Sequence, residues 1–255
     1  MTSTEGAART VVLTGRPGAT THRAVEVLAS LPPELRLIGG LAVMCRVGMP
    51  HRATVDLDAI TRGLEIQAPL IARVAVTSSG GGQYTFEDHL ELDVIDVAPL
   101  GANELVDEWI AAGPLTDLEL NAVGHTWAHD SATAVNLVVI SDEDSTLLAS
   151  APRRLVASPG GLVAMKATTV LLRASARPEK RASDLYDLAR LLVRTEGVGY
   201  ELETAPEPLR VAVIERLRAW FVEPAGRDRT YRDVRRFDDP PVDLDDVADA
   251  VEELG

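Results

Sequence analysis

"LIGGLAVMCRVGMPHRATVDLDAI", residues 37–60, decides how the rest of the chain is interpreted. A glycine pair, Gly39 and Gly40, follows a short apolar run, and Asp56 and Asp58 then occupy alternate positions of a second apolar run. Side chains two positions apart in a strand point to the same face, so the two carboxylates are expected side by side. Like charges repel, and burying them without a compensating group is costly. The sequence therefore predicts that something holds this pair.

The glycine pair and the aspartates fit one kind of site. Gly39 and Gly40 stand between an expected strand and an expected short helix, where free backbone N–H groups bind anions and glycine lets a phosphate come close. Paired carboxylates hold hard cations such as Mg²⁺ through their oxygens. A third acid, Asp93 or Asp96, lies in the next apolar run, "LELDVIDV" (residues 90–97). Together these groups predict a site for a nucleoside triphosphate and its magnesium ions.

Length and composition limit the classes of protein. The chain has 255 residues, 46% of them hydrophobic, which suffices for one large domain or two small ones. No apolar run reaches the roughly 18 residues of a membrane span, and no signal peptide is apparent, so a cytoplasmic protein is expected. The single cysteine, Cys45, excludes an intrachain disulfide and a multi-cysteine zinc site. The net charge of −14 argues against a general nucleic-acid coat protein.

The pattern of residues changes along the chain near residue 103. The first hundred residues alternate between helix-like and strand-like stretches with one hairpin turn, whereas the remainder is mostly helical apart from one strand at 133–141. We therefore expect an α+β protein. Its first domain, residues 1–103, contains the sheet and the candidate site, and its second, residues 104–255, is mainly helical.

The stretch around the two aspartates resembles a known group of enzymes. A glycine turn, a short helix and a D-x-D strand are similar to the signature of the DNA polymerase β-like nucleotidyltransferase superfamily. The fuller R-x-T-x-D-x-D run, which adds Arg52 and Thr54, resembles the AbiEii-type nucleotidyltransferase toxins of bacterial toxin–antitoxin pairs. That branch also carries a downstream lysine helix and a D-x-x-D helix, which resemble "MKATTVLLRASA" with Lys166 and "KRASDLYDLARLL" with Asp184 and Asp187.

The resemblance implies a fold, a reaction and a set of roles. It implies a polymerase β-like sheet domain that transfers a nucleoside monophosphate from an NTP to an acceptor hydroxyl with Mg²⁺. The acceptor implied is RNA, in particular the 3′ end of tRNA. The resemblance also implies a cognate antitoxin as a further partner, and no membrane. The implied roles are triphosphate binding by Gly39, Gly40, Arg52 and Thr54, and metal binding by Asp56, Asp58 and Asp93. Asp93 would also assist deprotonation of the acceptor. Lys166 would neutralise phosphate charge and Asp184 would orient this lysine, and the helical domain would contribute these two residues to the site.

Two alternatives remain open from the sequence. In the first, the acceptor is a small molecule, as in antibiotic-modifying enzymes, or a protein side chain. In the second, the protein is a catalytically inactive relative that serves as a binding module.

The segment "RDRTYRDVRRF", residues 227–237, places five arginines in an acidic protein. It is interpreted either as a strip that contacts RNA or as a segment whose arginines pair with the acidic tail at residues 243–253.

Overall fold

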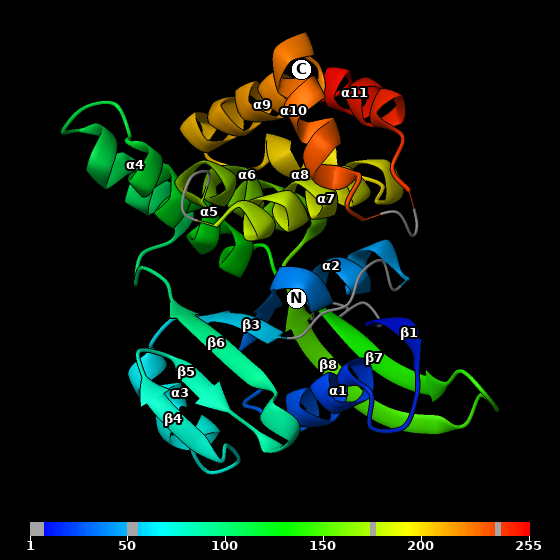
Figure 1. Ribbon diagram of the computed structural model, residues 1–255. Coiled ribbons are helices and arrows are strands. Elements are labelled where there is room, and N and C mark those ends of the chain that lie inside the picture. Colours follow the sequence, from blue (N-terminus) through cyan, green and yellow to red (C-terminus); the bar gives the residue numbers. More distant parts are fainter. Residues whose placement is uncertain (1–7, 50–55, 174–176, 238–240) are drawn as a thin grey trace, which may run out of the picture. The chain divides into compact units, whose positions relative to one another are not determined.

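The computed structural model describes the chain except for residues 1–7, 50–55, 174–176 and 238–240. The protein divides into two compact units, each described below by itself. The first consists of residues 1–96 and 132–156, and the second of residues 97–131 and 157–255. An eight-stranded sheet in the first unit and helices in the second confirm the expected α+β class (Figure 1).

The first unit is built on one mixed sheet. Its strand order is β1-β7-β8-β2-β3-β6-β5-β4. The strands are β1 (Arg9–Gly15), β2 (Arg36–Ile38), β3 (Asp56–Thr61), β4 (Thr77–Gly80), β5 (Gln83–Thr85), β6 (Glu91–Asp96), β7 (Thr133–Ser141) and β8 (Leu147–Val156). The central strand β3 is antiparallel to its neighbour β2 and parallel to its neighbour β6. β3 and β6 therefore end at the same edge of the sheet, which brings their acidic residues together.

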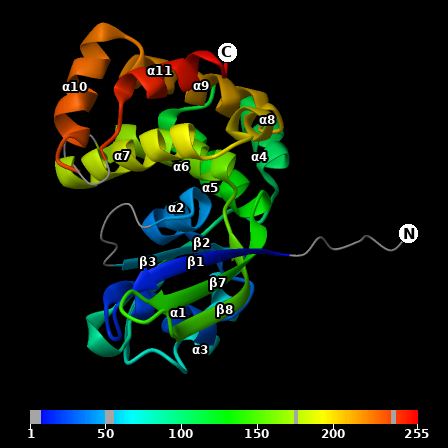
Figure 2. The ribbon, with the colours of Figure 1, turned by 90° about the vertical axis from the view of Figure 1, so that its right-hand side faces the viewer.

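Three helices pack on this sheet: α1 (Thr20–Ser30), α2 (Gly39–Val47) and α3 (Leu64–Ile71). Figure 2 shows α2 on one face of the sheet and α1 and α3 on the other. Between the layers lie fully buried side chains such as Leu57 on β3, Leu92 on β6 and Leu41 on α2. A short 3-10 turn, η1 (Glu87–His89), precedes β6.

The division of the chain differs from the expected boundary at residue 103. The chain passes from the first unit to the second after Asp96. It returns to the first unit for β7 and β8, and enters the second unit again after Val156. The return follows from strand pairing, because β7 pairs with β1 and β8 pairs with β2. Strands far apart in sequence thus complete one sheet, which a change in composition along the chain does not reveal.

The second unit is helical. Its helices are α4 (Ala102–Ile110), α5 (Asp117–Asp130), α6 (Pro159–Arg173), α7 (Pro178–Arg194), α8 (Val198–Glu203), α9 (Glu207–Phe221), α10 (Pro224–Val234) and α11 (Leu244–Glu252). α6 and α7 form its centre, and residues such as Leu162, Leu185 and Leu188 are inaccessible to solvent. Pro159 and Pro178 stand at the starts of α6 and α7, where a proline's missing N–H costs no hydrogen bond.

Candidate active site on the sheet and a buried ion cluster in the helical unit

The aspartates of β3 and β6 lie in register. Asp58 pairs with Asp93, and Asp56 pairs with Glu91 two residues earlier on each strand. Paired residues of neighbouring strands share a face, so Asp56, Asp58 and Asp93 are on the same side of the sheet. All three are half-buried, while Leu57 and Leu92, which point to the other face, are buried. The sheet therefore gathers three carboxylates at partly solvated positions.

Asp96 is engaged elsewhere. It lies three positions beyond Asp93 and so points to the opposite face of β6. Its Oδ1 accepts hydrogen bonds from the backbone N–H groups of Gly63 and Leu64, at 2.9 and 3.1 Å. A carboxylate at this position satisfies free N–H groups at the start of α3 and complements the helix dipole. Of the two acids that the sequence offered, only Asp93 shares the face of Asp58.

The glycine turn lies directly against this group. Gly39 begins α2 with a φ of +71°, a conformation that favours glycine. A Cβ added there would lie 2.0 Å from Asp58 Oδ2 and 2.8 Å from Asp58 Cβ. The glycine is therefore required both by its backbone angle and by the close approach of the Asp58 side chain. The carboxylate and the start of α2 share one small space.

The start of α2 also has free hydrogen-bonding capacity. Within the described residues no side chain caps it, and its first turn holds no acidic side chain. By contrast, Thr116 caps α5 and Asp243 caps α11. The N–H groups of an uncapped first turn point outwards and carry partial positive charge, as a phosphate site requires.

Arg46 fixes the other end of α2. One of its guanidinium nitrogens, Nη2, donates to Thr133 Oγ1 at 2.7 Å and to the carbonyl oxygen of Val156 at 2.5 Å. These acceptors belong to the start of β7 and the end of β8. The helix that presents Gly39 is thus tied at its C-terminal end to the sheet. Arg52 and Thr54, the other predicted triphosphate-binding residues, lie outside the described residues.

In the helical unit the predicted lysine forms a buried ion cluster. Lys166 Nζ lies 2.8 Å from Asp184 Oδ1 and 2.8 Å from Asp187 Oδ2. The three residues are 3%, 4% and 0% exposed. Asp184 also pairs with Arg173, which stands two helical turns after Lys166 on α6. The sequence interpretation missed Arg173, although its seven-residue spacing from Lys166 places both on the same face of the helix.

A histidine adjoins this cluster. His125 Nδ1 lies 2.8 Å from the carbonyl oxygen of Asn121. Burial lowers the pKa of His125, and the nearby Arg173 guanidinium lowers it further, against the opposite effects of the Asn121 carbonyl and Asp184. Neutral imidazole is therefore the favoured form in the folded protein.

These features define a class of protein. It is an α+β protein whose D-x-D strand faces a glycine-led helix, with a lysine and a D-x-x-D helix in its helical part. A family profile, described as nucleotidyl transferase AbiEii toxin of type IV toxin–antitoxin systems, matches residues 23–253. The chain belongs to this family, as the resemblance in its sequence predicted. No curated protein and no solved structure matches it.

Family membership carries two further statements. The family is one of nucleotidyl transferases, and a type IV toxin–antitoxin system implies a cognate antitoxin. In the part of the chain that the structure describes, no helix is long and apolar enough to cross a bilayer.

Proposed function

We propose that the protein is a Mg²⁺-dependent nucleotidyltransferase that transfers a nucleoside monophosphate from an NTP to the hydroxyl of an RNA, with the 3′ end of tRNA as the preferred acceptor. The observation that carries the proposal is the in-register pair Asp58 and Asp93 against the uncapped, glycine-led start of α2. Anion-binding N–H groups and cation-binding carboxylates on one sheet face suit a triphosphate with its metal ions.

The residues present fit magnesium in their chemistry. Carboxylate oxygens are the ligands that Mg²⁺ takes from proteins, and it completes its shell with water and substrate phosphates. Among the described residues, no three His, Cys, Asp or Glu side chains already stand as a complete ligand set. Asp56, Asp58 and Asp93 would hold the ion together with water and substrate phosphates. When bound, magnesium would neutralise the triphosphate and the departing pyrophosphate.

In the reaction, the chain's own groups have separate tasks. The N–H groups at Gly39 and Gly40 hold phosphate oxygens and orient the α-phosphate. Asp93 accepts the proton of the acceptor hydroxyl. At the same time the hydroxyl oxygen forms a bond to the α-phosphorus, and the bond between the α-phosphorus and the departing pyrophosphate breaks. Gly39 keeps Asp58 close to the phosphates because no side chain separates them. Arg52 and Thr54 add predicted triphosphate contacts.

In the helical unit, Lys166 is proposed to neutralise phosphate charge. Its two carboxylate partners, Asp184 and Asp187, hold its ammonium group in one position. A buried ammonium group needs partners that replace its lost hydration, so the two aspartates act as positioning residues for Lys166.

The test uses purified protein with Mg²⁺, each labelled NTP in turn, and either total tRNA or candidate small molecules. Label on tRNA that disappears with Asp56→Ala is the expected result. Label on a small molecule only would assign the acceptor to the antibiotic-modifying type, which the net charge of −14 favours over a polyanion. No label on any acceptor and no Mg²⁺-dependent NTP binding by the folded protein would rule out transferase activity.

The toxin role has its own test. Expression of the protein in a bacterial host is expected to arrest growth, and Asp58→Ala is expected to relieve the arrest while the protein level stays unchanged. Arrest that persists with Asp58→Ala would separate the toxicity from the transfer reaction.

A further inference from the structure

The arginine-rich segment at residues 227–237 is only partly neutralised by its surroundings. Arg227 pairs with Asp245 of α11, as the interpretation based on the acidic tail predicted. Asp233 pairs with Arg181 of α7 and is therefore not available to the other arginines of the segment. The remaining four arginines of the segment are Arg229, Arg232, Arg235 and Arg236.

These four arginines form an exposed basic surface, which we call the arginine face. Each is exposed, and within the described residues none of them forms an ion pair; Arg232 Nε donates only to the backbone carbonyl of Asp228. Arg229 and Arg232 lie on the side of α10 opposite the buried Thr230 and Val234, and Arg235 and Arg236 directly follow the last residue of this helix. The acidic side chain of Asp228 lies among them and cannot balance four positive charges.

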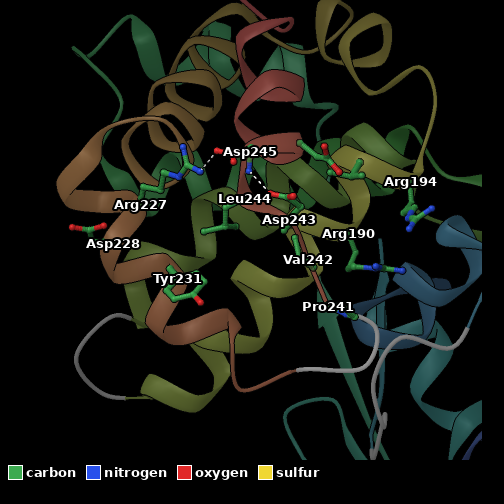
Figure 3. A pocket seen from close by; sticks show the side chains of 13 residues that line it. Arg190, Arg194, Arg227, Asp228, Tyr231, Pro241, Val242, Asp243, Leu244 and Asp245 are labelled. Carbon is green, nitrogen blue, oxygen red and sulfur yellow. Dashed lines mark hydrogen bonds and ion pairs between the residues drawn. The ribbon is translucent and has the colours of Figure 1, made fainter.

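An exposed aromatic residue lies beside the arginine face. Tyr231 is 56% exposed, and its ring lines a cavity of about 610 Å³. Figure 3 shows Tyr231 and Arg227 on α10, Arg190 and Arg194 on α7, and the segment that begins at Pro241. The cavity therefore has an aromatic wall and basic groups from two helices.

The cavity also contains carboxylates, which limit what enters it. Its lining includes four aspartates, Asp228, Asp243, Asp245 and Asp246. Arg227 neutralises Asp245, and Asp243 Oδ1 accepts a hydrogen bond from the Asp245 N–H. The remaining negative charge repels phosphates and acidic side chains but accepts hydrogen bonds from amino groups, such as those on nucleobases.

We propose that the arginine face and Tyr231 bind a single-stranded stretch of RNA, with phosphates on Arg229, Arg232, Arg235 and Arg236 and a base against the Tyr231 ring. The proposal rests on the proposed function, since the strand is the acceptor RNA. Exposed arginines that form no ion pair with the part of the chain the structure describes can bind a polyanion, and a neighbouring exposed aromatic ring stacks a base. An acidic protein segment would use the arginines but would gain nothing from the ring.

The experiment measures direct binding. The anisotropy of a fluorescein-labelled, single-stranded 20-nucleotide RNA of mixed sequence is titrated with the full-length protein, without NTP or Mg²⁺, at several salt concentrations. The test variant combines Arg232→Gln, Arg235→Gln and Arg236→Gln. The control combines Arg16→Gln, Arg210→Gln and Arg218→Gln, which remove the same charge elsewhere on the surface.

The expected result is specific to the arginine face. The test variant should bind at least about 10-fold more weakly, and the slope of log K against log salt should fall by about 2, at roughly 0.7 for each lost phosphate contact. Binding by the control variant should stay within about 2-fold of wild type. Tyr231→Ala should weaken binding roughly 5- to 150-fold through lost stacking, and Tyr231→Phe should restore most of it.

Three outcomes would overturn the proposal. One is a test variant that binds RNA as tightly as the control with an unchanged salt slope. Another is a Tyr231→Ala variant that binds like wild type. The third is a poly-glutamate peptide that binds wild type as tightly as the RNA does, which would assign the face to an acidic protein. Thermal unfolding of each variant confirms that it is folded.

Failure of this proposal is distinguishable from failure of the transferase function. If wild type binds RNA through the arginine face but labels no acceptor with any NTP, the surface stands and the transfer reaction fails. If tRNA is labelled but the test variant binds RNA normally, the reaction stands and the surface fails.

Discussion

Replacing Gly39 by alanine tests the close approach between α2 and β3. The new Cβ would lie 2.0 Å from Asp58 Oδ2, 2.7 Å from its Cγ and 2.8 Å from its Cβ. Rotation of the carboxylate alone does not relieve these contacts, because the Asp58 Cβ is itself too close. The side chain and the strand must therefore move, and a positive φ adds roughly 1–2 kcal/mol of backbone strain for alanine.

Gly18→Ala provides a matched control. Gly18 has a φ of +78°, but a Cβ there would meet nothing within 4 Å. The control should lose about 1–2 kcal/mol of unfolding free energy and keep full activity. Gly39→Ala should lose about 1–3 kcal/mol more, because the added methyl group overpacks the contact with Asp58.

Activity is the more sensitive measurement for this pair. A misplacement of about 1 Å in a catalytic group costs on the order of 10²-fold in rate. Nucleotide transfer by Gly39→Ala should therefore fall at least about 10²-fold below that of Gly18→Ala, and urea unfolding gives both stabilities. Equal stability and equal activity of the two variants would refute the packing described here.

Three further predictions concern buried groups. Lys166→Ala removes the ammonium group that pairs with the buried Asp187 and leaves Asp184 paired with Arg173. It should cost about 3–5 kcal/mol in urea unfolding, whereas the exposed Lys180→Ala should stay within about 0.5 kcal/mol of wild type; equal losses would show that the cluster is not formed. Burial lowers the pKa of His125 from 6.5, so its contribution to stability should be complete above pH 6.5 and be lost as the pH falls below that value toward the lower pKa of the folded state. His125→Gln should therefore flatten the dependence of the unfolding free energy on pH in this range. An unchanged pH dependence would contradict the prediction. Burial raises the pKa of Cys45 to about 12, so a thiol reagent at pH 8 should label it only after unfolding, and rapid labelling of the native protein would place it at the surface.

Local patterns in the sequence predicted much of the fold. The patterns "RATVDLDAI" and "HLELDVIDVAPL" predict strands where the structure has β3 and β6, and "PGGLVAMKATTVLLRASA" and "KRASDLYDLARLLVRTEG" predict helices where it has α6 and α7. The register between β3 and β6 was not predictable, because pairing between distant strands depends on the whole sheet. For that reason the residues alone left both Asp93 and Asp96 open as the third acid, with Asp93 preferred, and the structure places the two on opposite faces.

Two strands were missed for identifiable reasons. β1 (Arg9–Gly15) lies near the start of the chain, where the sequence was not interpreted as a strand, and it forms through parallel pairing with the distant β7. β8, which the sequence did not predict, contains Pro152, a residue that lacks an N–H for the ladder. The structure accommodates it at a register shift opposite Asn136, whose side chain accepts the hydrogen bond of the Arg153 N–H at 3.0 Å.

The candidate site was predictable to the level of residue types. The D-x-D spacing and the glycine pair indicated carboxylates and an anion-binding turn, and a single local stretch contains both. The partnership of Asp58 with Gly39, and of Lys166 with Arg173 through Asp184, depends on tertiary packing. Sequence spacing alone does not encode such contacts.

The central claim is that Asp58 and Asp93 hold the divalent metal ion of an NTP complex. Its most direct test is titration of the protein with Mn²⁺, as a paramagnetic substitute for Mg²⁺, monitored by electron paramagnetic resonance with and without each NTP. Wild type and Asp96→Asn should bind Mn²⁺ in an NTP-dependent manner, because Asp96 caps α3 instead of facing the site. The double variant Asp58→Asn, Asp93→Asn should fold but lose this binding. NTP-dependent Mn²⁺ binding of wild-type strength by the double variant would contradict the claim.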